Sequence, residues 1–167
     1  MTANTGRTSG KWIKWQLEDS AGTLRDLPIS SINGLGLNYP EVDVSAIQDA
    51  VKGFLTGQPD YSLEVGGPFD TAAAQAASGS GAVAALSGSH TVLYPLNGVL
   101  TPLGFAIYLG IRHAWETGEP VFGLASSAAN GLIEVNYNPD FINGTYMATF
   151  RLYPGSAAPA WGTAAIS

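Results

Sequence analysis

Few side chains in this sequence could carry out chemistry. The 167 residues include no cysteine and two histidines, His90 and His113. The lack of cysteine excludes disulfides, thiol catalysis and cysteine-based zinc sites, and two histidines limit both metal binding and serine–histidine catalysis. His90 lies in a Ser-Gly-Ser-His-Thr stretch, where we expect it to cap a short helix. His113 follows Arg112 at the end of an apolar segment, which favours a strand-end or interface role.

The acidic residues could in principle supply a carboxylate pair of the kind that hydrolyses glycosides. There are 13 of them, so chance pairs are expected, and solvated or interface carboxylates are the simpler interpretation. The sequence contains no Walker loop, nucleophile elbow, HExxH or EF-hand pattern. We therefore expect no enzyme activity, no catalytic residue, no metal and no cofactor. A hydrolase built on an acid pair is the alternative, and loss of turnover on one Asp or Glu substitution would support it.

Four tryptophans could stack on sugars, fill a core or anchor a subunit interface. Two of them, Trp12 and Trp15, fall on opposite faces of one predicted strand, so at most one belongs to the domain's own core. We expect Trp12 and Trp161 to be interface aromatics. A carbohydrate-binding β-sandwich that uses exposed Trp and Tyr is the alternative.

Charge is sparse and negative. Charged residues make up 12% of the chain, about half the usual share, and the net charge is −6 with a pI near 4.6. Much of the uncharged surface could therefore meet other subunits, although a plain Ser/Thr/Asn/Ala surface is the alternative. Seven scattered basic residues do not favour tight nucleic-acid binding. The polar first ten residues and the Pro102-interrupted apolar stretch 98–111 predict neither export nor membrane insertion.

Alternating apolar and polar residues predict a sheet-dominated domain. In the strand 12–18, Ile13, Trp15 and Leu17 form the buried face, with Lys14, Gln16 and Glu18 on the opposite face toward solvent. Asn130-Gly131 predicts a tight hairpin, whereas Asn143-Gly144 falls in a longer connection that Pro139 helps to break. The predicted strands are 12–18, 23–27, 31–37, 61–65, 103–111, 121–125, 132–137 and 146–153.

Three other segments have different patterns. Residues 89–96 predict one or two helical turns, stopped by Pro95 and Asn97-Gly98. The Ala/Gly/Ser-rich segment 71–89 predicts a mobile loop. Within 39–60, a capping box at Ser45 would allow a short helix that includes Ile47 and Phe54, although glycines and Pro59 confine it.

A series of strand and turn segments recurs in a fixed order along about three-quarters of the chain. They are 29–37 (ISSINGLGL), 41–46 (EVDVSA), 49–60 (DAVKGFLTGQPD), 61–65, 67–70 (GPFD), 134–139 (EVNYNP), 153–157 (YPGSA) and 161–163 (WGT). Their order and spacing resemble the major tail tube proteins of long-tailed, siphophage-type bacteriophages. The Ala/Gly/Ser segment 71–89 departs from that family, which places a compact helix there. The family also makes 39–60 an extended loop, and we favour this interpretation over the short helix.

The resemblance implies a mainly β fold, sandwich or barrel-like, with one short α-helix and long loops. Such subunits form hexameric rings whose inner strands join into one barrel, and the rings stack into a tube around an acidic lumen for DNA passage. The loop would bridge rings or subunits through Glu41, Asp43, Ile47, Asp49, Lys52, Phe54 and Leu55.

The implied partners are further copies of the chain and other tail proteins, namely the tape measure, terminator and distal tail proteins. Genomic DNA would pass without tight binding, and the protein would be assembled in the bacterial host cytoplasm into the virion tail, away from membranes. We expect an N-terminal arm at 1–10, one β-rich domain at 11–155 and a C-terminal arm at 156–167. Another virion ring protein, such as a tail terminator, distal tail or head–tail joining subunit, is the main alternative.

Overall fold

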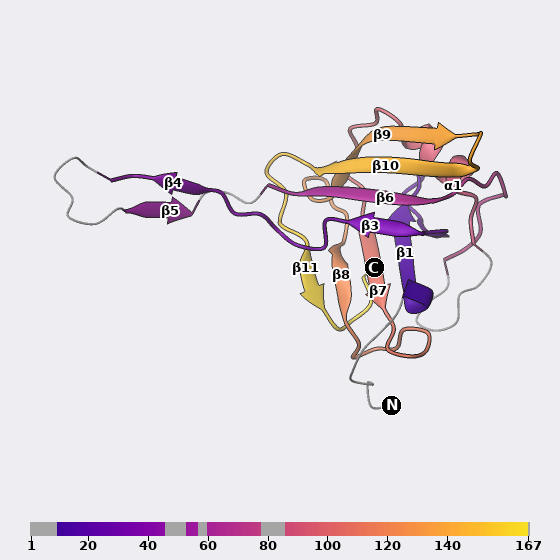
Figure 1. Cartoon of the computed structure of the whole chain (residues 1–167), viewed down its shortest axis with the longest axis horizontal. Helices are drawn as coiled ribbons and strands as arrows, with labels where there is room; N and C mark the ends of the chain where they lie inside the picture. Colours follow the sequence, from indigo (N-terminus) through magenta and orange to yellow (C-terminus); the bar gives the residue numbers. More distant parts are fainter. Residues whose placement is uncertain (1–9, 46–52, 57–59, 78–85, 167) are drawn as a thin grey trace.

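Two antiparallel sheets form the body of the protein, and a two-stranded hairpin projects from it (Figure 1). The computed structural model describes residues 10–45, 53–56, 60–77 and 86–166. The five-stranded sheet has the order β11-β8-β7-β1-β2, the four-stranded sheet has the order β3-β6-β10-β9, and β4 pairs with β5. The strands are β1 Ile13–Glu18, β2 Leu24–Leu27, β3 Ser31–Asn33, β4 Glu41–Asp43, β5 Phe54–Thr56, β6 Ser62–Pro68, β7 Phe105–Leu109, β8 Val121–Leu124, β9 Leu132–Asp140, β10 Thr145–Leu152 and β11 Ala160–Gly162.

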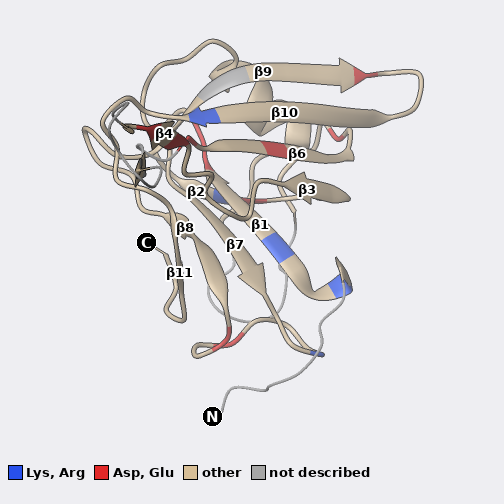
Figure 2. Cartoon of the chain, turned by 60° about the vertical axis from the view of Figure 1, so that its left-hand side comes forward, with Lys and Arg blue, Asp and Glu red and all other residues tan. Residues whose placement is uncertain are grey.

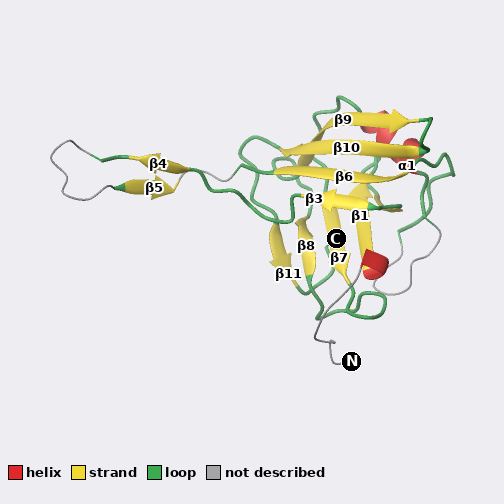
Figure 3. Ribbon diagram, in the orientation of Figure 1, coloured by secondary structure: helices red, strands yellow, loops and turns green. Residues whose placement is uncertain are grey.

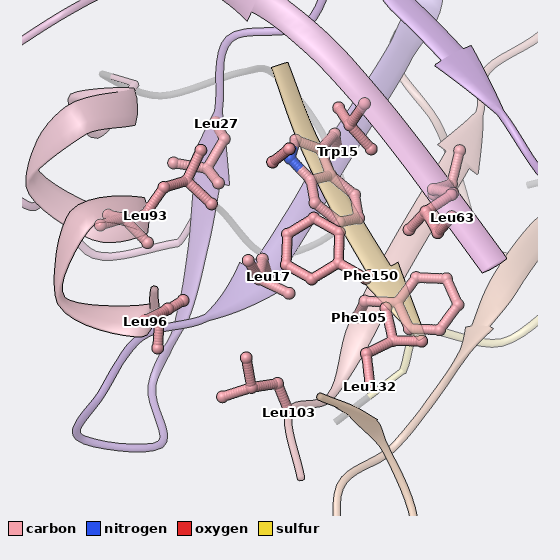
Figure 4. Close-up of a cluster of buried hydrophobic side chains, with 14 of the residues drawn as sticks. Trp15, Leu17, Leu27, Leu63, Leu93, Leu96, Leu103, Phe105, Leu132 and Phe150 are labelled. Carbon is pink, nitrogen blue, oxygen red and sulfur yellow. The ribbon is translucent and has the colours of Figure 1, made fainter. Parts of the chain in front are cut away.

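The core lies between the facing sides of the two sheets (Figure 4). Trp15 of β1 is 1% exposed, and its ring centroid lies 6.3 Å from that of Phe105 and 6.1 Å from that of Phe150. Phe105 comes from β7 and Phe150 from β10, so these rings join both sheets. The period-2 alternation of each strand places such side chains on the inner face, which confirms the predicted mainly β fold.

The outer face of β1 differs from the prediction, because it is buried as well. Lys14 is 8%, Gln16 4% and Asp26 of the neighbouring β2 1% exposed. Gln16 Nε2 donates to Asp26 Oδ1 at 2.6 Å, and Lys14 Nζ lies 3.8 Å from the same carboxylate oxygen. Because these polar groups satisfy one another, the five-stranded sheet tolerates cover on both faces. Burial lowers the pKa of Lys14, and Asp26 opposes that effect.

The predicted helical turns at 89–96 are confirmed as the α-helix α1, Ser89–Leu93, and the 3-10 helix η2, Tyr94–Leu96. The prediction that His90 caps the helix is wrong. Gly88 occupies the N-cap without a side-chain bond, and His90 lies inside the first turn. Of the predicted mobile segment 71–89, residues 71–77 and 86–88 have no regular secondary structure, and 78–85 lie outside the described residues.

Two turn predictions were wrong. Asn130-Gly131 does not close a hairpin, because β8 and β9 belong to different sheets. The tight hairpin is instead the connection between β9 and β10, where Asp140 accepts hydrogen bonds from the backbone N–H of Ile142 and Asn143, and Gly144 has a φ of 65°. Pro139 does not break β9, because β9 is an edge strand and a proline there removes no ladder hydrogen bond.

The ends of the domain also differ from the predictions in detail (Figure 3). Trp12 belongs to a 3-10 helix, η1 Gly10–Trp12, so it is not in the strand as predicted. Residues 1–9 of the expected N-terminal arm lie outside the described residues. Within 156–167, expected to be an arm, β11 pairs with β8 and extends the five-stranded sheet, because the Ala160–Gly162 backbone meets the free edge of β8. Strand β3 ends at Asn33, since Gly34 has a φ of 106°.

No helix in the described part of the chain is long and apolar enough to cross a membrane.

Candidate assembly interface

The hairpin of β4 and β5, called here the hairpin arm, extends away from both sheets (Figure 1). Its register pairs Glu41 with Thr56, Val42 with Leu55 and Asp43 with Phe54. Val44 N–H donates to Gly53 O at 2.9 Å, which continues the pairing past the strand end. The described residues of 39–60 are thus extended, as the family resemblance implied, and Phe54 lies in a strand instead of the alternative helix.

One face of the hairpin arm is apolar, and the other carries two acids together with the positions of Phe54 and Thr56. Val42 and Leu55 are cross-strand partners on one face, where they are 52% and 61% exposed, and Val44 follows two residues later. Glu41 and Asp43 point to the other face. The pKa of Asp43 is lowered by hydrogen bonds from Ser45. A two-stranded ribbon with an exposed apolar face is marginally stable alone in water, so this geometry favours a packing partner.

Four of the seven residues predicted for the bridging loop fall in the hairpin arm: Glu41, Asp43, Phe54 and Leu55. The other three, Ile47, Asp49 and Lys52, lie outside the described residues. The described part of the predicted loop is therefore one connected element at one end of the molecule (Figure 1).

The two sheets differ in their outer faces. The five-stranded sheet is covered on its outer side, where Tyr108, Trp115 and Val121 pack with Ala106 in a second apolar cluster. The outer side of the four-stranded sheet is open and polar, and Figure 2 shows few charged positions on β6, on β10 and on the described part of β9. Its exposed side chains include Ser31, Asn33, Ser62, Glu64, Asn136, Asn138, Thr145, Met147 and Arg151.

The outer edge of β9 is closed at three places. Leu132 and Leu103 exchange backbone hydrogen bonds of 2.8 and 2.7 Å at the start of the strand. Farther along, Tyr137 N–H donates to Asn97 Oδ1 at 3.3 Å. Two residues later Pro139 faces the same side and has no N–H to offer. At these three places a strand added by another molecule would meet backbone groups that are already bonded or, at Pro139, an N–H that is absent.

The two predicted interface aromatics are not brought together. Trp12 is half-buried at the start of β1, with Lys11 Nζ 4.7 Å from its ring centroid. Trp161 is 51% exposed on the edge strand β11 and contacts the Phe122 ring at 5.0 Å. Strands β8 and β7 separate β11 from β1 in the five-stranded sheet. Their interface role stays a prediction.

His90 is surrounded by aromatic rings. Its centroid lies 5.1 Å from Phe69, 5.2 Å from Tyr94 and 5.7 Å from Tyr137, and its Nδ1 is 3.0 Å from the Tyr137 hydroxyl. Burial raises the pKa of Tyr137 to about 12. The imidazole has aromatic neighbours in place of the base-and-nucleophile pair that catalysis would need, so the geometry indicates packing.

His113 and Glu119 stabilise the connection between β7 and β8. The fully buried Glu119 carboxylate accepts from Ile111 N–H at 3.3 Å and from Glu116 N–H at 3.0 Å, and His113 Nε2 lies 3.3 Å from it. These bonds explain why the sequence has a histidine just past a strand end. Among the described residues there is no group of three His, Cys, Asp or Glu side chains placed to hold a metal ion.

The two antiparallel sheets and the projecting hairpin define this chain as a mainly β protein. The sequence matches no family model and no curated protein. A chain from the extended sheath–tube complex of an extracellular contractile injection system (PVC) is similar with a TM-score of 0.59, 9% identity and coverage of 95% of this chain and 93% of that one.

Two further solved structures are similar in fold. The sheath/tube terminator of PVC has a TM-score of 0.60, 10% identity and coverage of 96% and 99%. The anti-feeding prophage cap, described as a tube-terminating cap, has a TM-score of 0.58, 12% identity and coverage of 98% and 96%. At these identities the likeness establishes a shared fold. It supports a tail-tube-like fold and does not single out the siphophage type.

Proposed function

We propose that this chain is a structural subunit of a phage-type tail tube that associates with copies of itself into rings, hexameric as in the resembling family, which stack. The observation that carries the proposal is the hairpin arm, which holds Val42, Val44 and Leu55 exposed, away from the body of the domain. A single molecule leaves this apolar face in water, whereas a neighbouring ring could cover it. The fold shared with the PVC sheath–tube chain supports the same proposal.

We infer that the open face of the four-stranded sheet lines the lumen. It is the uncovered sheet face in the described part of the chain, and it is rich in hydroxyl and amide side chains. Among the side chains that the structure describes on this face, Glu64 and Arg151 are the exposed charges, so the face is polar with few positive groups to hold phosphate. Such a surface would let DNA pass without tight binding.

The remaining parts of the proposal follow from the same role. The chain would assemble in the host cytoplasm, reside in the virion tail and contact tape measure, terminator and distal tail proteins. An enzymatic activity is not part of this role.

A second candidate is a ring that ends a tube. Two of the similar structures, the PVC terminator and the anti-feeding prophage cap, are described as terminating proteins. The closure of much of the β9 edge by Leu103, Asn97 and Pro139 is compatible with a subunit whose contacts are limited in number.

Negative-stain electron microscopy of the concentrated protein tests the proposal. We expect hollow tubes for a tube subunit and single open rings for a terminator. A variant without residues 41–57 is the matched control, and it should keep its β-rich circular dichroism spectrum and fail to stack. Monomers at all concentrations, or normal tubes from the deletion variant, would contradict the assigned roles.

A further inference from the structure

The hairpin arm needs a surface that is apolar and flanked by positive charge. Its apolar face carries Val42, Val44 and Leu55, and its opposite face carries Glu41 and Asp43. A cation beside the ribbon can attract acids on its far face when salt is low, because the Debye length grows to about 30 Å at 0.01 M ionic strength. Apolar shape and charge sign can therefore both be used to search for the receiving surface.

A crevice of about 80 Å³ meets both requirements. It lies where the start of β1 approaches β3, and its apolar lining is Ile13, Ile29 and Ile32, with Ser31 at its side. Lys11, which is exposed, stands next to it on η1 over the Trp12 ring. We call this surface, formed by Gly10, Ile13 and residues 29–32, the isoleucine crevice.

The isoleucine crevice and the hairpin arm lie apart in the molecule. Figure 1 shows the arm extending to the left beyond the sheets, while η1 and the start of β1 lie right of centre in the lower part of the body. An arm cannot reach the crevice of its own chain, but a second copy in the same orientation presents its crevice to it. Such a head-to-tail contact is heterologous, and repeated contacts of this kind build rings or stacks.

Another exposed apolar surface has the wrong charge. Ile142 is 96% and Phe141 71% exposed at the turn between β9 and β10. Asp140 accepts a hydrogen bond from Ile142 N–H within this turn. Asp70 is also close, because it follows Phe69 in the chain and the Phe69 ring centroid lies 5.0 Å from that of Phe141. Two acids beside this turn would repel an acidic arm, whereas Lys11 beside the isoleucine crevice attracts it.

We propose that the isoleucine crevice receives the hairpin arm of a second copy of this chain, with Val42 and Leu55 against Ile13, Ile29 and Ile32. Glu41 and Asp43 then lie on the outward face of the docked arm, where Lys11 at the rim of the crevice attracts them and steers the contact. This inference rests on the proposed function and names the receiving surface for it. It also gives the half-buried Trp12, predicted as an interface aromatic, a place at the rim of the contact.

Disulfide trapping tests the contact cleanly, because the chain has no cysteine. Two single variants of the full chain, Leu55→Cys and Ser31→Cys, are mixed, assembled and oxidised under mild conditions. Ile142→Cys replaces Ser31→Cys as the matched control, because it is fully exposed on the other apolar surface. We expect several-fold more heterodimer from the Leu55→Cys and Ser31→Cys pair, and Lys11→Glu should lower that yield at low salt, with Glu41→Lys restoring it.

The outcomes separate this inference from the proposed function. Rings or tubes that cross-link through Ile142→Cys in place of Ser31→Cys overturn the crevice and leave the function standing. The Ser31→Cys variant could also cross-link only when residues 2–9 have been removed. That result would show that the chain's own N-terminus occupies the crevice, and it would overturn the proposal. A full chain that gives no rings, tubes or cross-links under microscopy and oxidation overturns both.

Discussion

At the scale of single residues, two buried tyrosines in this core have opposite surroundings. The Tyr146 hydroxyl donates to Pro28 O at 2.8 Å and is satisfied. The Tyr61 hydroxyl is equally buried and has no hydrogen-bond partner among the described residues. Burial raises the pKa of both phenols, so both stay neutral in ordinary buffers. A buried hydroxyl that makes no bond loses its water without compensation.

We therefore expect the same substitution to have different effects at the two sites. Tyr146→Phe should lower the free energy of unfolding by about 1–2 kcal/mol, because it leaves the buried Pro28 carbonyl unpaired. Tyr61→Phe should leave stability unchanged or raise it slightly. Chemical denaturation of both variants measures the difference, and equal losses at the two positions would mean that the Tyr61 hydroxyl has a bond of its own.

Glu119 is a second residue whose role is local and testable. Glu119→Gln replaces one acceptor oxygen by an N–H donor that faces Ile111 N–H, Glu116 N–H or His113. We expect a loss of about 1–3 kcal/mol in stability and faster hydrogen exchange at Ile111 and Glu116. Glu116→Gln, which changes a side chain and keeps the backbone donor, is the control. Unchanged exchange in Glu119→Gln would show that the loop keeps its order without the carboxylate.

At the scale of elements, alternation predicted strands well and predicted their surroundings less well. The pattern at 103–111 identified a strand covered on both faces, and β7 is buried almost throughout. The same reasoning placed Lys14 and Gln16 in solvent, because a sequence does not show that Asp26 will lie beside them. Asn130-Gly131 has the local signature of a hairpin, yet the sheet to which each flanking strand belongs depends on long-range packing.

The candidate assembly interface was predictable only in part for the same reason. The sequence placed Glu41, Asp43, Phe54 and Leu55 in one extended segment through a family resemblance. The isoleucine crevice combines Ile13 with residues 29–32, and the closed β9 edge combines Leu103, Asn97 and Pro139. Each of these arises from segments that are distant in sequence, and periodicity within one segment contains no information about them.

Asn97 gives a prediction at the element scale. Its side-chain oxygen occupies Tyr137 N–H on the outer edge of β9, which an added strand would otherwise use. Asn97→Ala should lower stability by about 0.5–1.5 kcal/mol and increase disordered aggregation, because the freed N–H can pair with another chain. Asn97→Asp keeps an acceptor and should behave like the native protein. Light scattering and denaturation compare them, and equal aggregation of both variants would remove this role from Asn97.

At the scale of the whole molecule, the two sheets differ in a way that suits the proposed tube subunit. The five-stranded sheet is covered on both sides and would form the outer layer of the proposed tube. The four-stranded sheet is closed on its inner side and open on the other, where its side chains are polar and sparsely charged (Figure 2). A polar, weakly charged wall is suited to the passage of a polyanion, since each added cation would hold phosphate through counterion release.

This division predicts where a positive charge converts passage into binding. Glu64 is exposed near the middle of the open face, opposite Thr149 of β10. Glu64→Lys changes its charge from −1 to +1, and the change repeats around every ring, so assembled tubes should retain DNA at low salt and release it as salt rises. Ala21→Lys, which places a similar cation at the exposed turn between β1 and β2, should not retain DNA inside tubes.

Nuclease protection of bound DNA separates interior from exterior binding, because outer-surface DNA is digested. Protection in Ala21→Lys tubes and its absence in Glu64→Lys tubes would place the open face outside the tube and assign the lumen to the other sheet.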